Sequence, residues 1–166
     1  MKTRAIIDKV LETFLVTIMG ILVLDVLWQV ISRYVLKSPS SFTDELARFL
    51  LIWVGILGAG YATGKKNHLA IDVLINKFGK KYRIIINVFI NGLVSLFALC
   101  VMVIGGGNLI YILLKLGNSS AALSVPIGYI YSVIPISGIL IIYYSLFDII
   151  TDVKTVMKTN QSLKKE

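Results

Sequence analysis

Long runs of apolar residues, separated by short polar segments, dominate the pattern along this chain. At about 1.5 Å per helical residue, each run is long enough to cross the roughly 30 Å apolar core of a bilayer. The pattern predicts an all-α integral membrane protein that forms a single membrane domain over residues 1–166. Its four predicted transmembrane helices cover about 10–31, 46–63, 84–106 and 125–147.

A shorter apolar segment at 69–78 has the periodicity of a surface helix. It cannot span a bilayer, so we predict an amphipathic helix that lies flat at the membrane interface. His68 and Asp72 are expected to order the turn that leads into this helix. The apolar residues fall on one helical face, at i, i+3, i+4 and i+7: Ile71, Leu74, Ile75 and Phe78.

Two of the long runs contain residues that interrupt helices. The third run continues to residue 114 and includes Gly105–Gly107. Either this helix is strongly tilted or it breaks at the glycines. We expect one span over 84–106 followed by a helical extension. In the fourth run, Pro126 suits a first helical turn, whereas Pro135 is expected to kink the interior.

Composition agrees with a membrane protein. Hydrophobic residues make up 57% of the chain and charged residues 16%, with a mean hydropathy of +0.84. An average soluble domain carries about 25% charged residues. Basic residues that flank the spans account for the net charge of +8, so no nucleic-acid partner is expected. The single cysteine, Cys100, lies in an apolar run, which leaves no disulfide framework and no metal motif.

The distribution of Lys and Arg predicts the orientation of the chain. All but four of the 17 such residues lie in the N-terminal segment, in 65–83 or in the C-terminal tail. The positive-inside rule therefore places both termini and the flat helix in the cytoplasm. The loops at 33–48 and 115–124 are then expected to face outward.

Charged residues near the membrane each allow two interpretations. Asp44 and Glu45 lie in the first turn of the second helix, and Arg48 follows one turn later on the same face. They form either a neutralised helix start at the water interface or an outer-face patch for docking or subunit contact. Asp25, inside the first span, is either an interfacial acid or a residue with a role in coupling or subunit contact.

The second span also carries a stripe of small residues. Hydrophobic force does not drive helices together in lipid, so small residues act by permitting close backbone approach. Gly60 and Gly64 add a G-x-x-x-G spacing to the same helix. The helix is therefore predicted to pack against another helix, of this chain or of a partner. The predicted packing residues are Trp53, Gly55, Gly58, Ala59 and Ala62.

Catalytic chemistry is not expected in this chain, and no cofactor is predicted. His68 is the single histidine, which excludes a bis-histidine haem anchor within the chain. The sequence offers no thiolate pair, no phosphate-binding loop and no Ser–His pairing at membrane depth. A complete ion-coupled carrier usually shows internal repeats with broken helices, and the two halves of this chain show no clear self-similarity.

The stretch from Asp44 to Asp72 resembles the small membrane subunit, or small permease, of tripartite ATP-independent periplasmic (TRAP) transporters. A second similarity covers Ser120–Pro126, Tyr131 and Ile134–Pro135. Gly60 replaces the usual second Ala of the family pattern, and the resemblance covers about residues 10–150. The matching residues of the first stretch are Glu45, Ala47, Arg48, Trp53, Leu57, Gly58, Ala59, His68 and Asp72.

The resemblance implies a multi-pass subunit of the bacterial inner membrane. In such systems a soluble periplasmic binding protein captures an organic acid, such as a C4-dicarboxylate, sialic acid or a keto acid. A large multi-span membrane subunit then carries the acid, driven by a sodium gradient. The small subunit supports the large one and helps to form the docking surface for the binding protein. The substrate and sodium sites are then expected on other chains.

Two other classes stay open from the residues alone. An autonomous small multidrug-type exporter would use Asp25 as its proton-coupled acid, although such chains are shorter and lack an amphipathic insertion. A membrane anchor for a redox or assembly complex is the other class, and the single His68 argues against direct haem ligation in it.

Overall fold

Helices account for most of the fold in the computed structural model, which describes residues 2–38, 40–65 and 80–163. Four helical stretches are long and apolar enough to cross a membrane: Arg4–Tyr34, Ser41–Gly64, Ile84–Lys115 and Ile127–Lys154. They confirm the predicted all-α, four-span architecture. The elements are α1 (Lys2–Tyr34), α2 (Ser41–Gly64), α4 (Lys80–Phe97), η1 (Ala98–Gly105), α5 (Gly106–Lys115), α6 (Ile127–Ile130) and α7 (Val133–Leu163).

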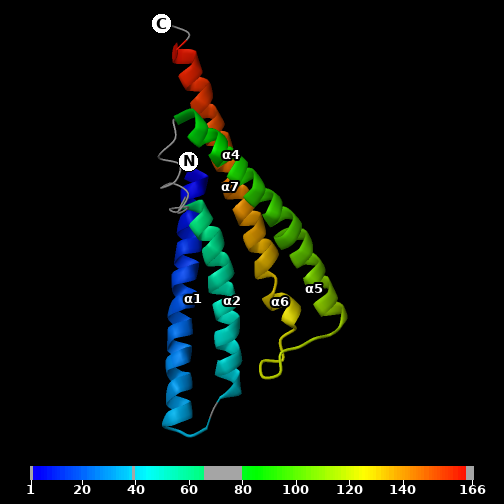
Figure 1. Ribbon diagram of the computed structural model, residues 1–166. Helices are drawn as coiled ribbons and strands as arrows, with labels where there is room; N and C mark the ends of the chain where they lie inside the picture. Colours follow the sequence, from blue (N-terminus) through cyan, green and yellow to red (C-terminus); the bar gives the residue numbers. More distant parts are fainter. Residues whose placement is uncertain (1, 39, 66–79, 164–166) are drawn as a thin grey trace.

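The helices are arranged side by side in the order α1, α2, α7 and α4–η1–α5 (Figure 1). Both chain ends lie at one end of the bundle, which we name the termini end. The α1–α2 connection and the loop between α5 and α6 lie at the opposite end, which we name the loop end. The predicted flat helix at 69–78, together with His68 and Asp72, lies outside the described residues.

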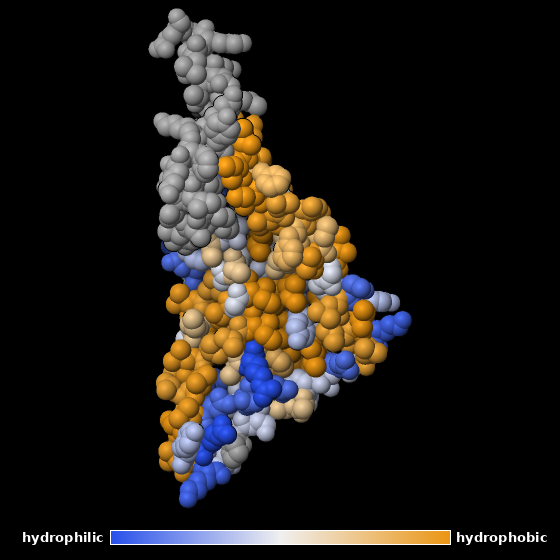
Figure 2. All heavy atoms as spheres, viewed as in Figure 1, coloured by the Kyte–Doolittle hydropathy of each residue, from blue (hydrophilic) through white to orange (hydrophobic). Residues whose placement is uncertain are grey.

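Helix α7 is the centre of the bundle. In its most apolar stretch 39% of the residues are buried, compared with 6–11% in the other three spans. Its fully buried side chains include Val133, Ser137, Tyr144 and Ser145. The outer helices expose large apolar side chains (Figure 2), and in a membrane protein such faces contact lipid or another subunit.

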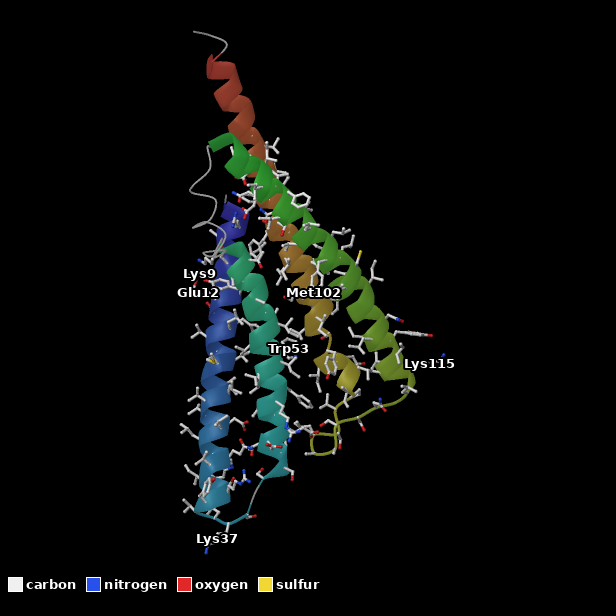
Figure 3. All side chains as sticks on the ribbon, in the orientation of Figure 1. Lys9, Glu12, Lys37, Trp53, Met102 and Lys115 are labelled. Carbon is white, nitrogen blue, oxygen red and sulfur yellow. The ribbon has the colours of Figure 1, made fainter. Side chains whose placement is uncertain are left out.

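The third span does not break at its glycines. Helix α4, the π-helical turns of η1 and α5 follow one another without interruption, and Gly105 and Gly106 keep helical backbone angles. Glycine is needed here for close packing instead. A Cβ on Gly106 would lie 3.0 Å from Ile134 Cγ2, and one on Gly138 would lie 2.8 Å from Cβ of Met102 (Figure 3). Of the two alternatives that the sequence left open, the break at the glycines is therefore absent, and the predicted helical extension forms α5.

The fourth span differs from the prediction at its start. Instead of one helix over 125–147, the short helix α6 ends at Ile130, and α7 begins at Val133. Pro135 consequently lies in the first turn of α7, where a missing backbone N–H interrupts no helical hydrogen bond. The predicted kink in a helix interior was wrong for this reason. Helix α7 then continues to Leu163, far into the predicted polar tail.

Candidate functional site

Helix α2 begins at the loop end with a side-chain cap. Ser40 is the N-cap, and its Oγ accepts a hydrogen bond from the Thr43 backbone N–H at 3.5 Å. The Thr43 hydroxyl donates in return to the Ser40 carbonyl at 3.0 Å. This cap fixes the first turn of α2, and it thereby positions the two acidic residues that follow.

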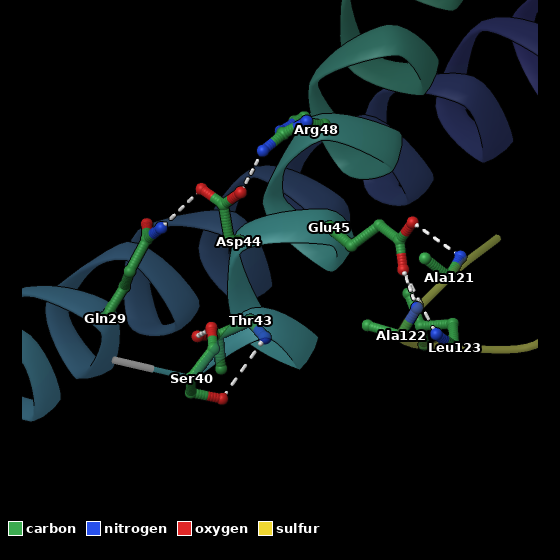
Figure 4. A network of polar contacts seen from close by, with 9 residues as sticks. All are labelled: Gln29, Ser40, Thr43, Asp44, Glu45, Arg48, Ala121, Ala122 and Leu123. Carbon is green, nitrogen blue, oxygen red and sulfur yellow. Dashed lines mark hydrogen bonds and ion pairs between the residues drawn. The ribbon is translucent and has the colours of Figure 1, made fainter. Parts of the chain in front are cut away.

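Asp44 connects α2 to α1. Its Oδ1 accepts a hydrogen bond from Gln29 Nε2 at 2.8 Å, and its Oδ2 forms an ion pair with Arg48 one turn later (Figure 4). The Arg48 side chain remains 70% exposed. The spacing of Asp44 and Arg48 had predicted that they share a face, whereas the contact with Gln29 had no local signal in the sequence.

Glu45 connects α2 to the loop between α5 and α6. Its Oε1 accepts from the Ala121 N–H at 3.2 Å, and its Oε2 accepts from Ala122 at 2.8 Å and Leu123 at 3.1 Å (Figure 4). A carboxylate that accepts several backbone N–H groups makes charge-assisted hydrogen bonds, which are stronger than neutral ones. Contact of Asp44, Glu45 or Arg48 with another subunit stays a prediction.

The loop that Glu45 holds has an ordered structure of its own. The Ser120 N–H donates to the Val125 carbonyl at 2.9 Å, and the Ile127 N–H donates to the Asn118 carbonyl at 2.9 Å. Ser120 is buried, and Ser124 adopts a positive φ of 52°. The resemblance to the TRAP small permease family had singled out Ser120–Pro126. Nothing in the sequence predicted that this segment contacts Glu45.

One side of α2 packs closely on α7. A Cβ on Gly60 would lie 2.9 Å from Ser137 Oγ, and one on Gly64 would lie 2.7 Å from Tyr144 Cζ. The Ser137 hydroxyl donates to the Ile56 carbonyl at 2.8 Å. The G-x-x-x-G pair of the sequence is therefore the contact with α7.

Trp53 also packs within the chain, because its Nε1–H donates to the Ile130 carbonyl of α6 at 3.0 Å (Figure 3). The other four predicted packing residues lie elsewhere on α2. Gly55 and Gly58 have no atom within 4 Å of an added Cβ, and Ala59 and Ala62 are exposed. Packing of these four against another subunit stays a prediction.

A second polar cluster lies at the termini end and was missed from the sequence. Arg4 Nη1 donates to Asp148 Oδ1 at 2.9 Å, and its Nη2 donates to the Gly64 carbonyl. The same guanidinium lies 4.9 Å from the ring centre of Phe147. Tyr144 donates to Asp8 Oδ1 at 2.7 Å. This cluster holds α1, α2 and α7 together.

The remaining acids of α1 have different surroundings. Glu12 Oε2 accepts a hydrogen bond from the Tyr61 hydroxyl at 3.1 Å. Asp25 Oδ2 is buried and has no hydrogen-bond partner among the described residues. In those same residues no group of three or more His, Cys, Asp or Glu side chains could hold a metal ion. The polar contacts that the structure does show hold helices and loops to one another.

Comparison with known proteins gives a consistent result. Residues 22–155 match the family described as "Tripartite ATP-independent periplasmic transporters, DctQ component". A TRAP transporter small permease protein of Haemophilus influenzae is 33% identical over 81% of this chain and 82% of its own length. The sialic acid TRAP transporter small permease protein SiaQ of Vibrio cholerae is 28% identical over 96% of this chain and 90% of its own length.

A third relative is much larger than this chain. The sialic acid TRAP transporter permease protein SiaT of Haemophilus influenzae is 39% identical over 82 residues. These residues are 49% of this chain and 13% of SiaT. A sequence similar to half of this chain thus occurs as a small part of a larger permease.

Proposed function

This chain belongs to the family of DctQ components of tripartite ATP-independent periplasmic transporters, and from that premise we propose that it is a supporting subunit rather than the carrier or an enzyme. As a TRAP transporter small permease, it is a multi-pass protein of the bacterial inner membrane. In the proposed role, it holds a large membrane subunit in place and helps to receive a periplasmic binding protein. The large subunit binds the substrate and carries it, driven by sodium.

The observation that carries this proposal is the similarity to a small part of SiaT. When two sequences occur as separate chains in some proteins and as parts of one chain in another, the separate chains commonly work as a complex. The large remainder of SiaT therefore favours a large membrane subunit as the partner of this chain. Four small residues of α2 would suit close contact with a helix of that partner: the exposed Gly55, Ala59 and Ala62 and the half-buried Gly58.

The proposed cargo is an organic acid, and sialic acid is the first candidate. The names of two relatives, SiaQ and SiaT, include sialic acid. In the proposed orientation the termini end faces the cytoplasm and the loop end faces the periplasm, since most Lys and Arg residues belong to the N-terminal segment, to 65–83 or to the C-terminal tail.

Reconstitution tests the proposed role. Proteoliposomes would contain the large subunit with or without this chain, and uptake of labelled sialic acid would be measured with the binding protein outside and a sodium gradient inward. We expect uptake with both membrane subunits and a loss of most uptake without this chain. Equal uptake in its absence, or uptake by this chain alone, would contradict a supporting role.

Labelling tests the proposed orientation independently. Ser124→Cys places a thiol on the exposed loop, in a Cys100→Ser background that removes the natural cysteine. An impermeant maleimide added to intact spheroplasts should label this residue, whereas Lys154→Cys at the termini end should react only after lysis. The reverse pattern would place the loop end in the cytoplasm.

A further inference from the structure

We propose that the soluble partner of this subunit docks on the loop formed by residues 118–126, and that it presents acidic side chains to the exposed cations at the same end of the bundle. We name these cations, Arg33, Lys37 and Lys115, the outer cations. The inference rests on the proposed function and its orientation. It goes further by naming the contact element and the charge of the partner surface that fits it.

The docking element is already ordered within this chain. Glu45 accepts three consecutive N–H groups from the loop, and two backbone hydrogen bonds close the loop at its base. Its exposed residues are all uncharged: Asn118, Ser119, Ala121, Ala122, Ser124, Val125 and Pro126. A surface that is ordered before binding loses little conformational entropy when a partner docks.

Acidic side chains are few at the loop end. The two segments at this end, residues 31–48 and 113–132, together contain two acidic residues, Asp44 and Glu45. Both carboxylates are engaged inside the chain, Asp44 with Gln29 and Arg48 and Glu45 with the loop amides. The loop end therefore offers few free negative charges to a partner.

The outer cations, in contrast, are exposed. None of the three forms an ion pair with another of the described residues, although the Lys115 ammonium lies 5.9 Å from the ring centre of Tyr111. In the view of Figure 3, Lys37 and Lys115 project at two corners of the loop end, and the loop lies between them. Figure 2 shows hydrophilic residues at the same positions.

An ordered, uncharged loop and exposed cations at the same end of the bundle together fit an acidic soluble protein. Complementary charge raises the rate of diffusional encounter and fixes the orientation of docking, while the neutral loop supplies the close contact. Acidic and basic residues of the loop end thus have different roles. The predicted docking residues Asp44 and Glu45 order the surface, and the outer cations face the partner. Anionic lipid headgroups are the other possible occupant of these cations, and the experiment separates the two.

The test measures binding of the transporter's own substrate-binding protein to the complete membrane complex in nanodiscs of uncharged phosphatidylcholine. Lys37→Glu combined with Lys115→Glu should lower the association rate about tenfold at low salt, with little change in dissociation. The difference should largely disappear at about 0.5 M salt. Lys154→Glu, an exposed lysine at the termini end, is the matched control and should leave both rates unchanged.

A second variant tests the loop itself. Glu45→Ala keeps the outer cations but removes the acceptor of the three amides, so the dissociation rate should rise several-fold while the low-salt association rate changes little. If the binding protein associates with all variants as with the wild type, the inference fails and the proposed function stands. If the charge reversals leave association of the binding protein unchanged and lower only the amount of anionic lipid that co-purifies with the complex, the inference also fails. If the binding protein does not associate with the wild-type complex, the proposed function fails with it.

Discussion

Asp44 and Glu45 are consecutive in the chain, yet their carboxylates contact opposite neighbours of α2. Asp44 accepts a hydrogen bond from Gln29 of α1, and Glu45 accepts three from the loop that precedes α6. Adjacent helical positions differ by about 100° in direction, so one turn of helix can hold two separate elements. The loop end of the bundle is consequently fixed from both sides by the start of α2.

The first prediction concerns the loop. Glu45→Ala should speed hydrogen exchange at the amides of Ala121, Ala122 and Leu123 several-fold, because the variant removes their acceptor and local opening becomes easier. Hydrogen exchange followed by mass spectrometry on the purified protein measures this change. Glu12→Ala, which removes a bond to Tyr61 at the other end, is the control. Unchanged exchange at 121–123 would show that the loop is held by its own backbone bonds.

The second prediction concerns the termini end. Arg4 and Asp148 form an ion pair with side chains only 18% and 8% exposed, so Arg4→Ala should destabilise the fold by about 3 kcal/mol. Arg4→Lys keeps the charge but loses the planar contacts to the Gly64 carbonyl and the Phe147 ring, and should lie in between. Unfolding by denaturing detergent measures both. Equal stability of Arg4→Ala and the wild type would show that α1 and α7 hold together without this pair.

The sequence predicted features that depend on neighbouring residues. The four membrane-spanning helices and the Asp44–Arg48 pair follow from local patterns in the sequence, and both are present in the structure. Features that join distant segments left no such signal. Arg4 and Asp148 are 144 positions apart, and Glu45 binds backbone amides, which every residue type except proline offers. No sequence pattern can mark such partners in advance.

Glycines and prolines show the same limit. The triplet Gly105–Gly107 suggested a possible break because glycine weakens an isolated helix, but Gly106 instead lies close to Ile134, whose Cγ2 would be 3.0 Å from an added Cβ. The kink expected at Pro135 depended on where its helix begins, and tertiary packing placed that start at Val133. Local helix propensity therefore identified these glycines and this proline as unusual positions, but it did not predict what they do in the fold.

The third prediction separates the two groups of glycines on α2. Gly64→Ala places a methyl group 2.7 Å from the Tyr144 ring, and overpacking of this kind should cost about 1–3 kcal/mol. Gly55→Ala is the matched control, since an added Cβ there meets no atom within 4 Å, and it should be neutral or slightly stabilising. Unfolding of the isolated chain in detergent measures both, and equal effects would contradict the packing of α2 on α7.

The fourth prediction concerns the exposed small residues of α2. Gly55→Leu with Ala59→Leu should leave the isolated chain folded but sharply reduce co-purification with the large subunit, because bulky side chains prevent close helix approach. Leu51→Ala on the same exposed side is the control that adds no bulk. Full co-purification of the double variant would place the large subunit on another face of this chain.

The fifth prediction concerns Asp25, whose Oδ2 is buried without a hydrogen-bond partner among the described residues. An unsatisfied polar group in an apolar helix contact costs stability, so Asp25→Leu should stabilise the isolated chain by about 1 kcal/mol. If substrate and sodium are handled by the large subunit, sialic acid uptake by the reconstituted complex should stay within about twofold of the wild type, a small change on the free-energy scale. Asp25→Asn keeps the shape of the side chain and should behave likewise in transport. Loss of uptake in both variants, with the complex still assembled, would instead give Asp25 the coupling role that its position inside a membrane span allows.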